Sequence, residues 1–278
     1  YGANNALSSG AVTVNDGGIY DLNNFSDAIG ALTVNSGTTG GSVTTGTGVL
    51  TLGGNVTSTG GAANASISGN LALGATRTFT TTNSADGLSV SAVISGVTFG
   101  VTKAGSGTLT LSGVNTYTGV TTISAGVLSV STIENGGVAG GIGQATNAAT
   151  NLVFGTGRLL YTGSTASTNR NFTINTGTTI TIDISNSGTN LTMSGASTST
   201  SGSMIKAGNG SLTMSGASQY TGSTTISAGA LIVGANVAVS TNGPLGNAAS
   251  AIVLGNSSTS ANNSSPSLLT GGAFTISR

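Results

Sequence analysis

The chain has 278 residues, of which only 12 are charged: six Lys or Arg and six Asp or Glu. Histidine, cysteine and tryptophan are absent, which excludes disulfide bonds, thiolate metal sites and histidine general bases. Six scattered cations cannot neutralise a run of phosphates, so we expect no nucleic-acid binding. No apolar stretch approaches the roughly 18 residues of a spanning helix, so we expect no membrane insertion by this segment.

A five-residue pattern, seen clearly in Gly48-Val49-Leu50-Thr51-Leu52, recurs about every 20 residues along the chain. Its third and fifth positions are apolar in every copy, and Thr or Ser stands between them in most copies. Such regular self-similarity indicates a repeat architecture. The copies start at residues 10, 30, 48, 69, 86, 107, 126, 150, 170, 189, 210, 229, 250 and 272.

The alternation of apolar and hydroxyl residues predicts short strands with one buried face. Further strand-like segments, such as Thr121–Ile123 and Thr224–Ile226, lie between the copies, and turns such as Asn15–Gly18 separate them. Two or three strands in each coil predict an all-β, right-handed parallel β-helix, a β-solenoid of about 14 rungs of roughly 20 residues. We expect the third and fifth positions to form its interior, with hydroxyl and amide ladders between rungs.

A longer repeat is superimposed on the short one. The segment Lys103–Gly113 returns as Lys206–Gly216, so the offset is 103 residues (206 − 103). Likewise Tyr117–Gly126 returns as Tyr220–Gly229. An Asn-Ala-Ala stretch then follows each copy, and we take these two stretches as equivalent landmarks; they begin at Asn147 and Asn247.

Residues 102–130 and 205–233 resemble the autotransporter-associated β-strand repeat. The shared pattern opens with Lys-x-Gly-x-Gly, continues with Leu-Thr-Leu-Ser-Gly and Tyr-Thr-Gly, and ends with Thr-Thr-Ile-x-Ala-Gly-x-Leu. The later copy departs from it only where Met214 replaces the second leucine. The resemblance implies a bacterial, secreted, surface-displayed β-solenoid.

We expect a single continuous β-solenoid over residues 1–278, with module landmarks near 1–130, 131–233 and 234–278. Two segments, Glu134–Gly141 and Asn256–Pro266, are expected to be loops that leave the coil. The sequence stops on the strand-like segment Phe274–Ile276 without a polar or helical cap. An uncapped end exposes strand edges, so we expect either a longer chain or a filament subunit.

The acidic residues near the start of the chain are the first candidates for chemistry. Asp16, Asp21 and Asp27 form the only local acidic group, and carboxylates are suitable calcium ligands. The alternative, which we favour, is that Asp16 belongs to a turn and the other two are solvated. We therefore predict no metal site, no cofactor and no catalytic residue.

The remaining charged and aromatic residues favour structural roles. We expect surface ion pairs across rungs between Lys103 and Asp86, and between Lys206 and Asp183. Tyr117 and Tyr220 each precede Thr-Gly at a bend; we favour corner packing over an exposed sugar-binding aromatic. Three arginines are isolated in the sequence: Arg77, Arg158 and Arg170.

These features predict a non-enzymatic structural or adhesive protein located outside the cell or at a bacterial cell surface. Self-association end to end is the expected partnership, with contact to a cell surface or a glycan as a further expectation. The alternative function is a carbohydrate-active β-helix enzyme or a glycan-binding module. In that alternative, Asp21, Asp27 and a loop tyrosine would line the groove.

Overall fold

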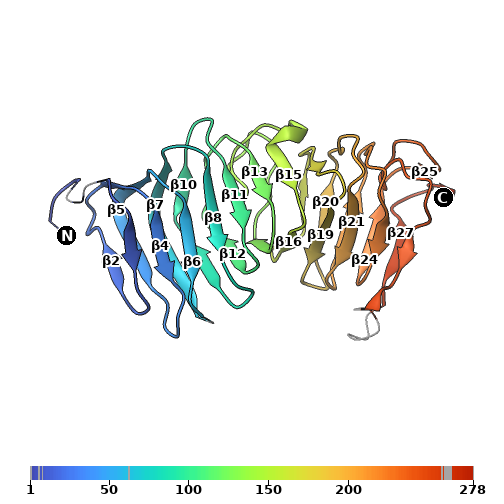
Figure 1. Ribbon diagram of the computed structural model, residues 1–278. Helices are drawn as coiled ribbons and strands as arrows, with labels where there is room; N and C mark the ends of the chain where they lie inside the picture. The colour runs from blue at the N-terminus through green and yellow to red at the C-terminus, as the bar shows by residue number, and fades with distance from the viewer. Residues whose placement is uncertain are drawn as a thin grey trace. The chain divides into compact units, whose positions relative to one another are not determined.

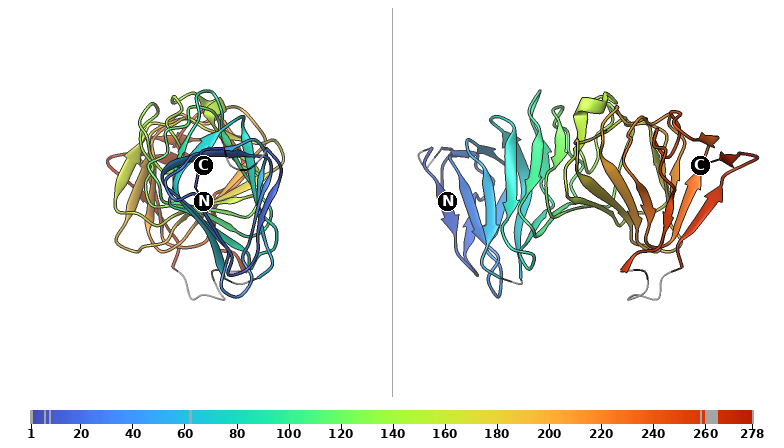
Figure 2. Two further views of the ribbon diagram at one scale, coloured as in Figure 1. Left: turned by 90° about the vertical axis from the view of Figure 1, so that its left-hand side faces the viewer. Right: turned by 45° about the vertical axis from the view of Figure 1, so that its right-hand side comes forward.

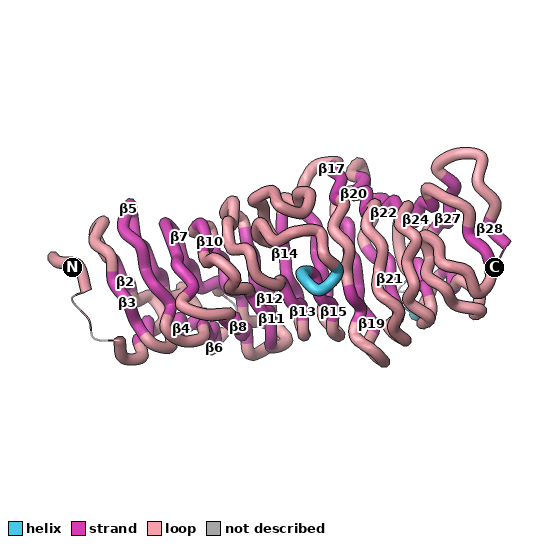
Figure 3. The backbone as a smooth tube through the Cα atoms, turned by 90° about the horizontal axis from the view of Figure 1, so that it is seen from above, coloured by secondary structure: helices cyan, strands magenta, loops and turns pink. Residues whose placement is uncertain are grey.

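The computed structural model describes residues 2–277, except for 6, 8, 62, 258 and 260–264. Short strands joined by turns account for nearly all of its regular structure, and η1 (Ala149–Asn151) is a single 3-10 turn (Figure 3). The strands pair in parallel with strands of neighbouring coils. The prediction of an all-β parallel β-solenoid is therefore confirmed. Its right-handed winding stays a prediction.

Residues 1–129 and 137–145 form the first of two compact units, called unit 1 below. Its coils stack so that the strands of each sheet lie side by side (Figure 1). The first sheet has the order β1 (Val12–Val14), β4 (Leu32–Asn35), β6 (Val56–Thr59), β8 (Arg77–Thr81), β11 (Val101–Ala104), β13 (Thr121–Ile123). The second has the order β2 (Ile19–Asp21), β5 (Ser42–Leu52), β7 (Asn64–Leu73), β9 (Gly87–Val90), β12 (Thr108–Leu111), β14 (Val127–Val130). Two short strands, β3 (Asp27–Ile29) and β10 (Val93–Ser95), pair with β5 and β7.

Residues 130–136 and 146–278 form unit 2, which is built in the same way (Figure 2). One sheet pairs β15 (Leu152–Phe154) with β18 (Thr173–Ile174). A second has the order β16 (Arg158–Tyr161), β19 (Thr179–Ile184), β21 (Ser203–Ala207), β23 (Thr224–Ile226), β26 (Val253–Leu254). A third has the order β17 (Ala166–Thr168), β20 (Asn190–Met193), β22 (Ser211–Met214), β24 (Ala230–Val233), β27 (Ser267–Thr270), and β25 (Val237–Ala238) pairs with β28 (Ile276–Ser277).

The third and fifth positions of the short pattern form the interior, as predicted. They are buried in every copy from the one that starts at residue 30 to the one that starts at residue 229. Strand alternation explains this, because residues two apart point to the same face. The prediction is wrong for the last two copies, where Leu254 and Phe274 are exposed on the final coils.

The predicted number of 14 rungs is too high, because the protein forms about ten turns. Coil lengths vary: Val12 pairs with Leu32, 20 residues later, whereas Leu32 pairs with Val56, 24 residues later. The five-residue pattern also changes sheet. In unit 1 the copy at 30 lies in β4 and the copy at 48 lies in β5, which belongs to the other sheet of the same unit. Each such change makes the pattern return before a full coil is complete.

Polar ladders run between coils, as predicted. The Thr198 hydroxyl donates to Thr173 Oγ1 at 3.0 Å, and Asn35 Nδ2 donates to Asn15 Oδ1 at 3.1 Å. The outer face of unit 1 is strongly hydroxylated, because register places Thr or Ser opposite Thr or Ser in successive strands. One column contains Thr13, Thr33, Thr57 and Thr80, and another contains Ser42, Ser66, Ser89 and Thr110.

The loop predicted at Glu134–Gly141 lacks strands, but it does not simply leave the coil. Gly140 makes an antiparallel bridge to Asn115, and Ile142 just beyond it is buried. The loop predicted at Asn256–Pro266 lies largely outside the described residues. A single continuous solenoid over the whole chain stays a prediction.

Candidate functional site

The long repeat contains a buried lysine, which we describe first in unit 1. Lys103 lies on β11 at an inward-facing position and is completely buried. Its ammonium group donates to three backbone carbonyl oxygens, those of Ala104 at 2.6 Å, Gly105 at 2.8 Å and Ala125 at 3.2 Å. The predicted surface ion pair with Asp86 is therefore wrong.

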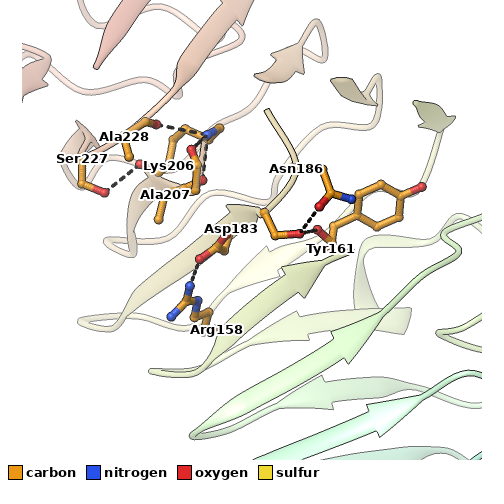
Figure 4. Close-up of polar contacts among 10 residues, drawn as sticks. Arg158, Tyr161, Asp183, Asn186, Lys206, Ala207, Ser227 and Ala228 are labelled. Carbon is orange, nitrogen blue, oxygen red and sulfur yellow. Dashed lines mark hydrogen bonds and ion pairs between the residues drawn. The ribbon is translucent and has the colours of Figure 1, made fainter. Parts of the chain in front are cut away.

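The second lysine has the same surroundings in unit 2. Lys206 on β21 is buried, and Nζ donates to the carbonyl oxygens of Ala207 at 2.7 Å, Gly208 at 2.9 Å and Ala228 at 3.1 Å (Figure 4). No ion pair to Asp183 forms, so this prediction is also wrong. Burial lowers the pKa of both lysines to about 8, although three carbonyl acceptors favour the charged form.

Glycine explains how the chain brings these carbonyls together. Gly105 and Gly208 have φ of +73° and +74°, a left-handed conformation that a residue with a Cβ adopts only at a cost. The chain therefore turns sharply after the lysine, and the carbonyls of the turn point back at the ammonium. The Lys-x-Gly motif is in this sense a self-contained cation cage.

The carboxylates that we expected beside the lysines have other partners. Asp86 is buried and accepts hydrogen bonds from the backbone N–H groups of Asn83 at 2.7 Å and Gly61 at 3.0 Å, and from the Ser36 hydroxyl at 3.1 Å. Burial raises the pKa of Asp86, but these hydrogen bonds outweigh it and hold the pKa below its usual range. Asp86 thus joins three coils of unit 1.

Asp183 forms an ion pair with Arg158, which the sequence analysis treated as isolated (Figure 4). Asp183 lies opposite Leu160 in the register of β16 and β19, so the pair runs diagonally between adjacent coils. The Asp183 side chain is 2% exposed, whereas that of Arg158 is 46% exposed. Loss of the arginine would leave a buried charge without its partner.

The two tyrosines of the long repeat are corner residues, as predicted. Tyr117 is fully buried, and its hydroxyl lies 2.7 Å from Thr121 Oγ1. Thr121 in turn donates to the Ile142 carbonyl at 2.9 Å. Unit 2 repeats this arrangement with Tyr220, Thr224 and Leu245, where the last distance is 3.5 Å.

A loop motif completes each copy, and the sequence analysis missed it. The segment 140–145, Gly-Gly-Ile-Gly-Gln-Ala, returns as 243–248, Gly-Pro-Leu-Gly-Asn-Ala. Gln144 N donates to the Tyr117 carbonyl and Asn247 N donates to the Tyr220 carbonyl, both at 2.7 Å. Asn247 therefore corresponds to Gln144, and the predicted match between Asn147 and Asn247 is wrong. The constant offset of 103 residues was the signal that could have revealed the loop.

The early acidic residues are not brought together as a metal site. Asp16 accepts four hydrogen bonds from residues 38–40, of which the backbone N–H groups in particular hold the pKa of this carboxyl far below its usual range. Asp27 accepts a hydrogen bond from Tyr20 at 2.9 Å, and Asp21 accepts one from the backbone of Asn23 at 2.8 Å. Within the described residues, no three acidic, histidine or cysteine side chains form a group that could hold a metal ion.

The other two described arginines also serve the backbone. Arg77 Nε donates to the Leu52 carbonyl at 3.0 Å. Arg170 is buried, and its Nε donates to the Glu134 carbonyl at 2.9 Å. Arg170 thereby fixes the start of the segment 134–136 within unit 2.

A groove lies on the outer face of the sheet that contains β16, β19 and β21. We call it the Arg158 groove; its lining includes Arg158, Leu160, Thr181, Asp183, Ile205 and Asn209. It combines an ion pair, aliphatic side chains, hydroxyls and amides on one surface. It is the most polar and chemically varied concave surface of unit 2.

Known proteins resemble parts of this chain. The family described as passenger-associated-transport-repeat matches residues 101–130 and 204–233. The adhesin BmaC autotransporter of Brucella suis biovar 1 (strain 1330) is 48% identical over 105 residues, which is 37% of this chain and 3% of that protein. The chain carries two autotransporter passenger repeats. The resemblance found in the sequence is thus confirmed. No solved structure matches the chain.

The matched ranges include the lysine cage and the Tyr–Thr pair of each passenger repeat. They stop before the loops at 140–145 and 243–248, which provide the carbonyl acceptor and cover each tyrosine. We therefore define the first copy as residues 101–145 and the second copy as residues 204–248. In the described parts of the chain, no helix is both long and apolar enough to cross a bilayer.

Proposed function

We propose that this chain is a stretch of an autotransporter passenger displayed at a bacterial cell surface, where it serves as a non-catalytic adhesive β-solenoid. The observation that carries the proposal is the pair of passenger repeats, whose interior contacts recur 103 residues apart. The similarity to a Brucella suis autotransporter adhesin supports the surface role. Because the aligned region is 3% of that protein, adhesion is a proposal for this chain.

The use of the charged side chains supports a non-catalytic role. General acid–base catalysis needs an acid and a base that face a substrate. Here both lysines bind backbone carbonyls, and Asp16 and Asp86 bind backbone N–H groups. The carbohydrate-active alternative relied on Asp21, Asp27 and a tyrosine, but Tyr20 and Asp27 bind each other.

End-to-end association is a further part of the proposal. Ile19 on the edge strand β2 is 73% exposed, and Leu254 on the edge strand β26 is 58% exposed. Further coils or a second copy would bury these side chains and pair the free strand edges. Electron micrographs of the purified chain should show filaments that lengthen with protein concentration. Discrete particles at every concentration would reject self-association while leaving surface display intact.

Surface display can be tested in the cells that produce the protein. An antibody raised against the purified chain should label intact cells, and external protease should remove the label. A strain that lacks the gene should adhere less well to surfaces or host cells. Label that appears only after the cells are permeabilised would contradict the proposal.

A further inference from the structure

The Arg158 groove differs from the corresponding surface of unit 1. On the outer face of β7, β9 and β12, register aligns three hydroxyl residues: Ser66, Ser89 and Thr110. In the Arg158 groove, register instead aligns Arg158, Thr181 and Ile205. Such a departure is not needed to build a coil, because the coils of unit 1 form without it.

The groove carries little net charge. The guanidinium of Arg158 is half exposed, and the carboxylate of Asp183 neutralises it from the groove floor. Neither a strongly anionic nor a strongly cationic ligand gains from such a surface. The pair nevertheless offers charge-assisted hydrogen bonds, since the exposed guanidinium has five N–H donors and the ion pair occupies only part of them.

Other polar groups in the groove are available to a ligand. No described residue hydrogen-bonds to the side chain of Thr181 or to that of Asn209, which is exposed at a turn. A hydroxyl and an amide can each donate and accept. These groups therefore suit a ligand that carries both donors and acceptors, as a sugar hydroxyl does.

The groove also provides apolar surface between the polar groups. Leu160 and Ile205 point outward by strand alternation and are only half-buried. A ligand that covered them would remove aliphatic surface from water. Binding sites commonly join such apolar lining to a few polar groups that fix orientation.

We propose that the Arg158 groove binds a neutral saccharide. A sugar ring combines C–H faces, which can cover Leu160 and Ile205, with hydroxyls that can bond to Arg158, Thr181 and Asn209. The inference names a ligand class for the proposed adhesive role and rests on it. It also moves the expected glycan contact from Asp21 and Asp27 to a surface that the sequence did not single out.

The test uses the purified chain on an array of neutral and acidic glycans, followed by calorimetric titration of the strongest neutral ligand. Ala207 lines the groove, and its side chain makes no part of the ion pair. Ala207→Tyr should fill the groove and weaken binding about tenfold or more. Ser89→Tyr adds the same ring to the outer face of unit 1 and should leave affinity unchanged.

A second pair of variants tests the charged group itself. Arg158→Gln should weaken binding about tenfold, because a charge-assisted hydrogen bond is lost. Arg77→Gln is the matched control, since Arg77 also donates to the backbone but lies in unit 1. Thermal unfolding of each variant identifies any that fail to fold.

Three results would overturn the saccharide site: no neutral glycan bound, binding of acidic glycans alone, or equal affinity in folded Ala207→Tyr and wild-type protein. Binding of peptides in place of glycans would equally reject it. None of these results would affect antibody labelling of intact cells. Failure of the saccharide site and failure of surface display are therefore distinguishable.

Discussion

The two copies of the passenger repeat agree in their interiors and differ in their surroundings. Both copies enclose a lysine in three carbonyls, bury a tyrosine against a threonine hydroxyl and close with a glycine-rich loop. Outside, the sheets of unit 1 present columns of hydroxyls, whereas unit 2 presents the ion pair and aliphatic side chains of the Arg158 groove. The comparison teaches that buried polar contacts define the repeat, while the outer face is free to vary.

The interior match extends to distances. Each lysine makes bonds of about the same three lengths in the two copies. The copies differ at the threonine, because Thr121 lies 2.9 Å from its carbonyl acceptor whereas Thr224 lies 3.5 Å away. Substitutions at matched positions should therefore have equal effects at the loop glycine and the lysine, and unequal effects at the threonine.

The largest effect is expected at the loop glycine. Gly143 and Gly246 both have φ of +78°, and a Cβ would lie 2.5 Å from the Tyr117 ring in the first copy and 2.3 Å from the Tyr220 carbonyl in the second. Backbone strain and overpacking together should lower the free energy of unfolding by about 3 kcal/mol in Gly143→Ala and in Gly246→Ala.

Urea denaturation measures this effect, and hydrogen exchange shows whether it is local. Gly137 provides a control: its φ is +88°, but a Cβ there would meet nothing within 4 Å. Gly137→Ala should lose only about 1 kcal/mol through strain. Equal losses at Gly137 and Gly143 would show that the tyrosine corner is not tightly packed.

Removal of the buried cation should have the next largest effect. Lys103→Met and Lys206→Met keep the volume of the side chain but leave three carbonyls without their donor. Each variant should lose about 2 kcal/mol, which is the cost of unsatisfied buried groups less the gain from an apolar side chain. Urea denaturation of both variants tests the comparison, because a difference greater than about 1 kcal/mol would mean that the cages are not equivalent.

The same lysines should make stability depend on pH. The pKa is 10.5 for an ordinary lysine and about 8 in the folded protein, so the unfolded chain binds more protons between these values. Stability should therefore rise as pH increases through this window, by about 1 kcal/mol per lysine from pH 7.5 to 9. Below pH 8 the lysines are protonated in both states, so their contribution no longer changes.

Urea midpoints at pH 7.5 and pH 9 measure this rise. The Lys103→Met, Lys206→Met double variant should lack it. Persistence of the rise in the double variant would assign it to other groups.

The smallest effect should distinguish the two copies. Thr121→Val removes a hydroxyl that bonds to both a tyrosine and a carbonyl, and it should cost about 1.5 kcal/mol. Thr224→Val should cost less, by about 0.5 kcal/mol, because its carbonyl bond is longer. Thermal unfolding of the two variants gives the comparison, and a larger loss at Thr224 would reverse it.

Much of the fold could be predicted because the interior repeats at two-residue spacing. Leu50 and Leu52 are buried for the reason that the pattern gave, and the same holds through most of the chain. The number of turns could not be read from the pattern. Successive copies can lie on different sheets, and the spacing alone does not show when the pattern has changed sheet.

The polar interior was harder to predict, because it depends on register and on glycine conformation. Lysine is rarely buried without a carboxylate, and only the left-handed turn at Gly105 shows that carbonyls replace it. Arg158 and Asp183 are 25 residues apart (183 − 158), about one coil, yet the assumed coil of 20 residues concealed the match. A coil length taken from the structure would have paired them.

The central claim is that both passenger repeats are built around a buried lysine, and amine labelling tests it directly. Lys103 and Lys206 are the only lysines in the chain, so mass spectrometry can follow each one after brief acetylation. We predict that neither is acetylated in the folded protein and that both are acetylated in urea. Rapid acetylation of either lysine in the folded protein would contradict the cage and return that lysine to the surface.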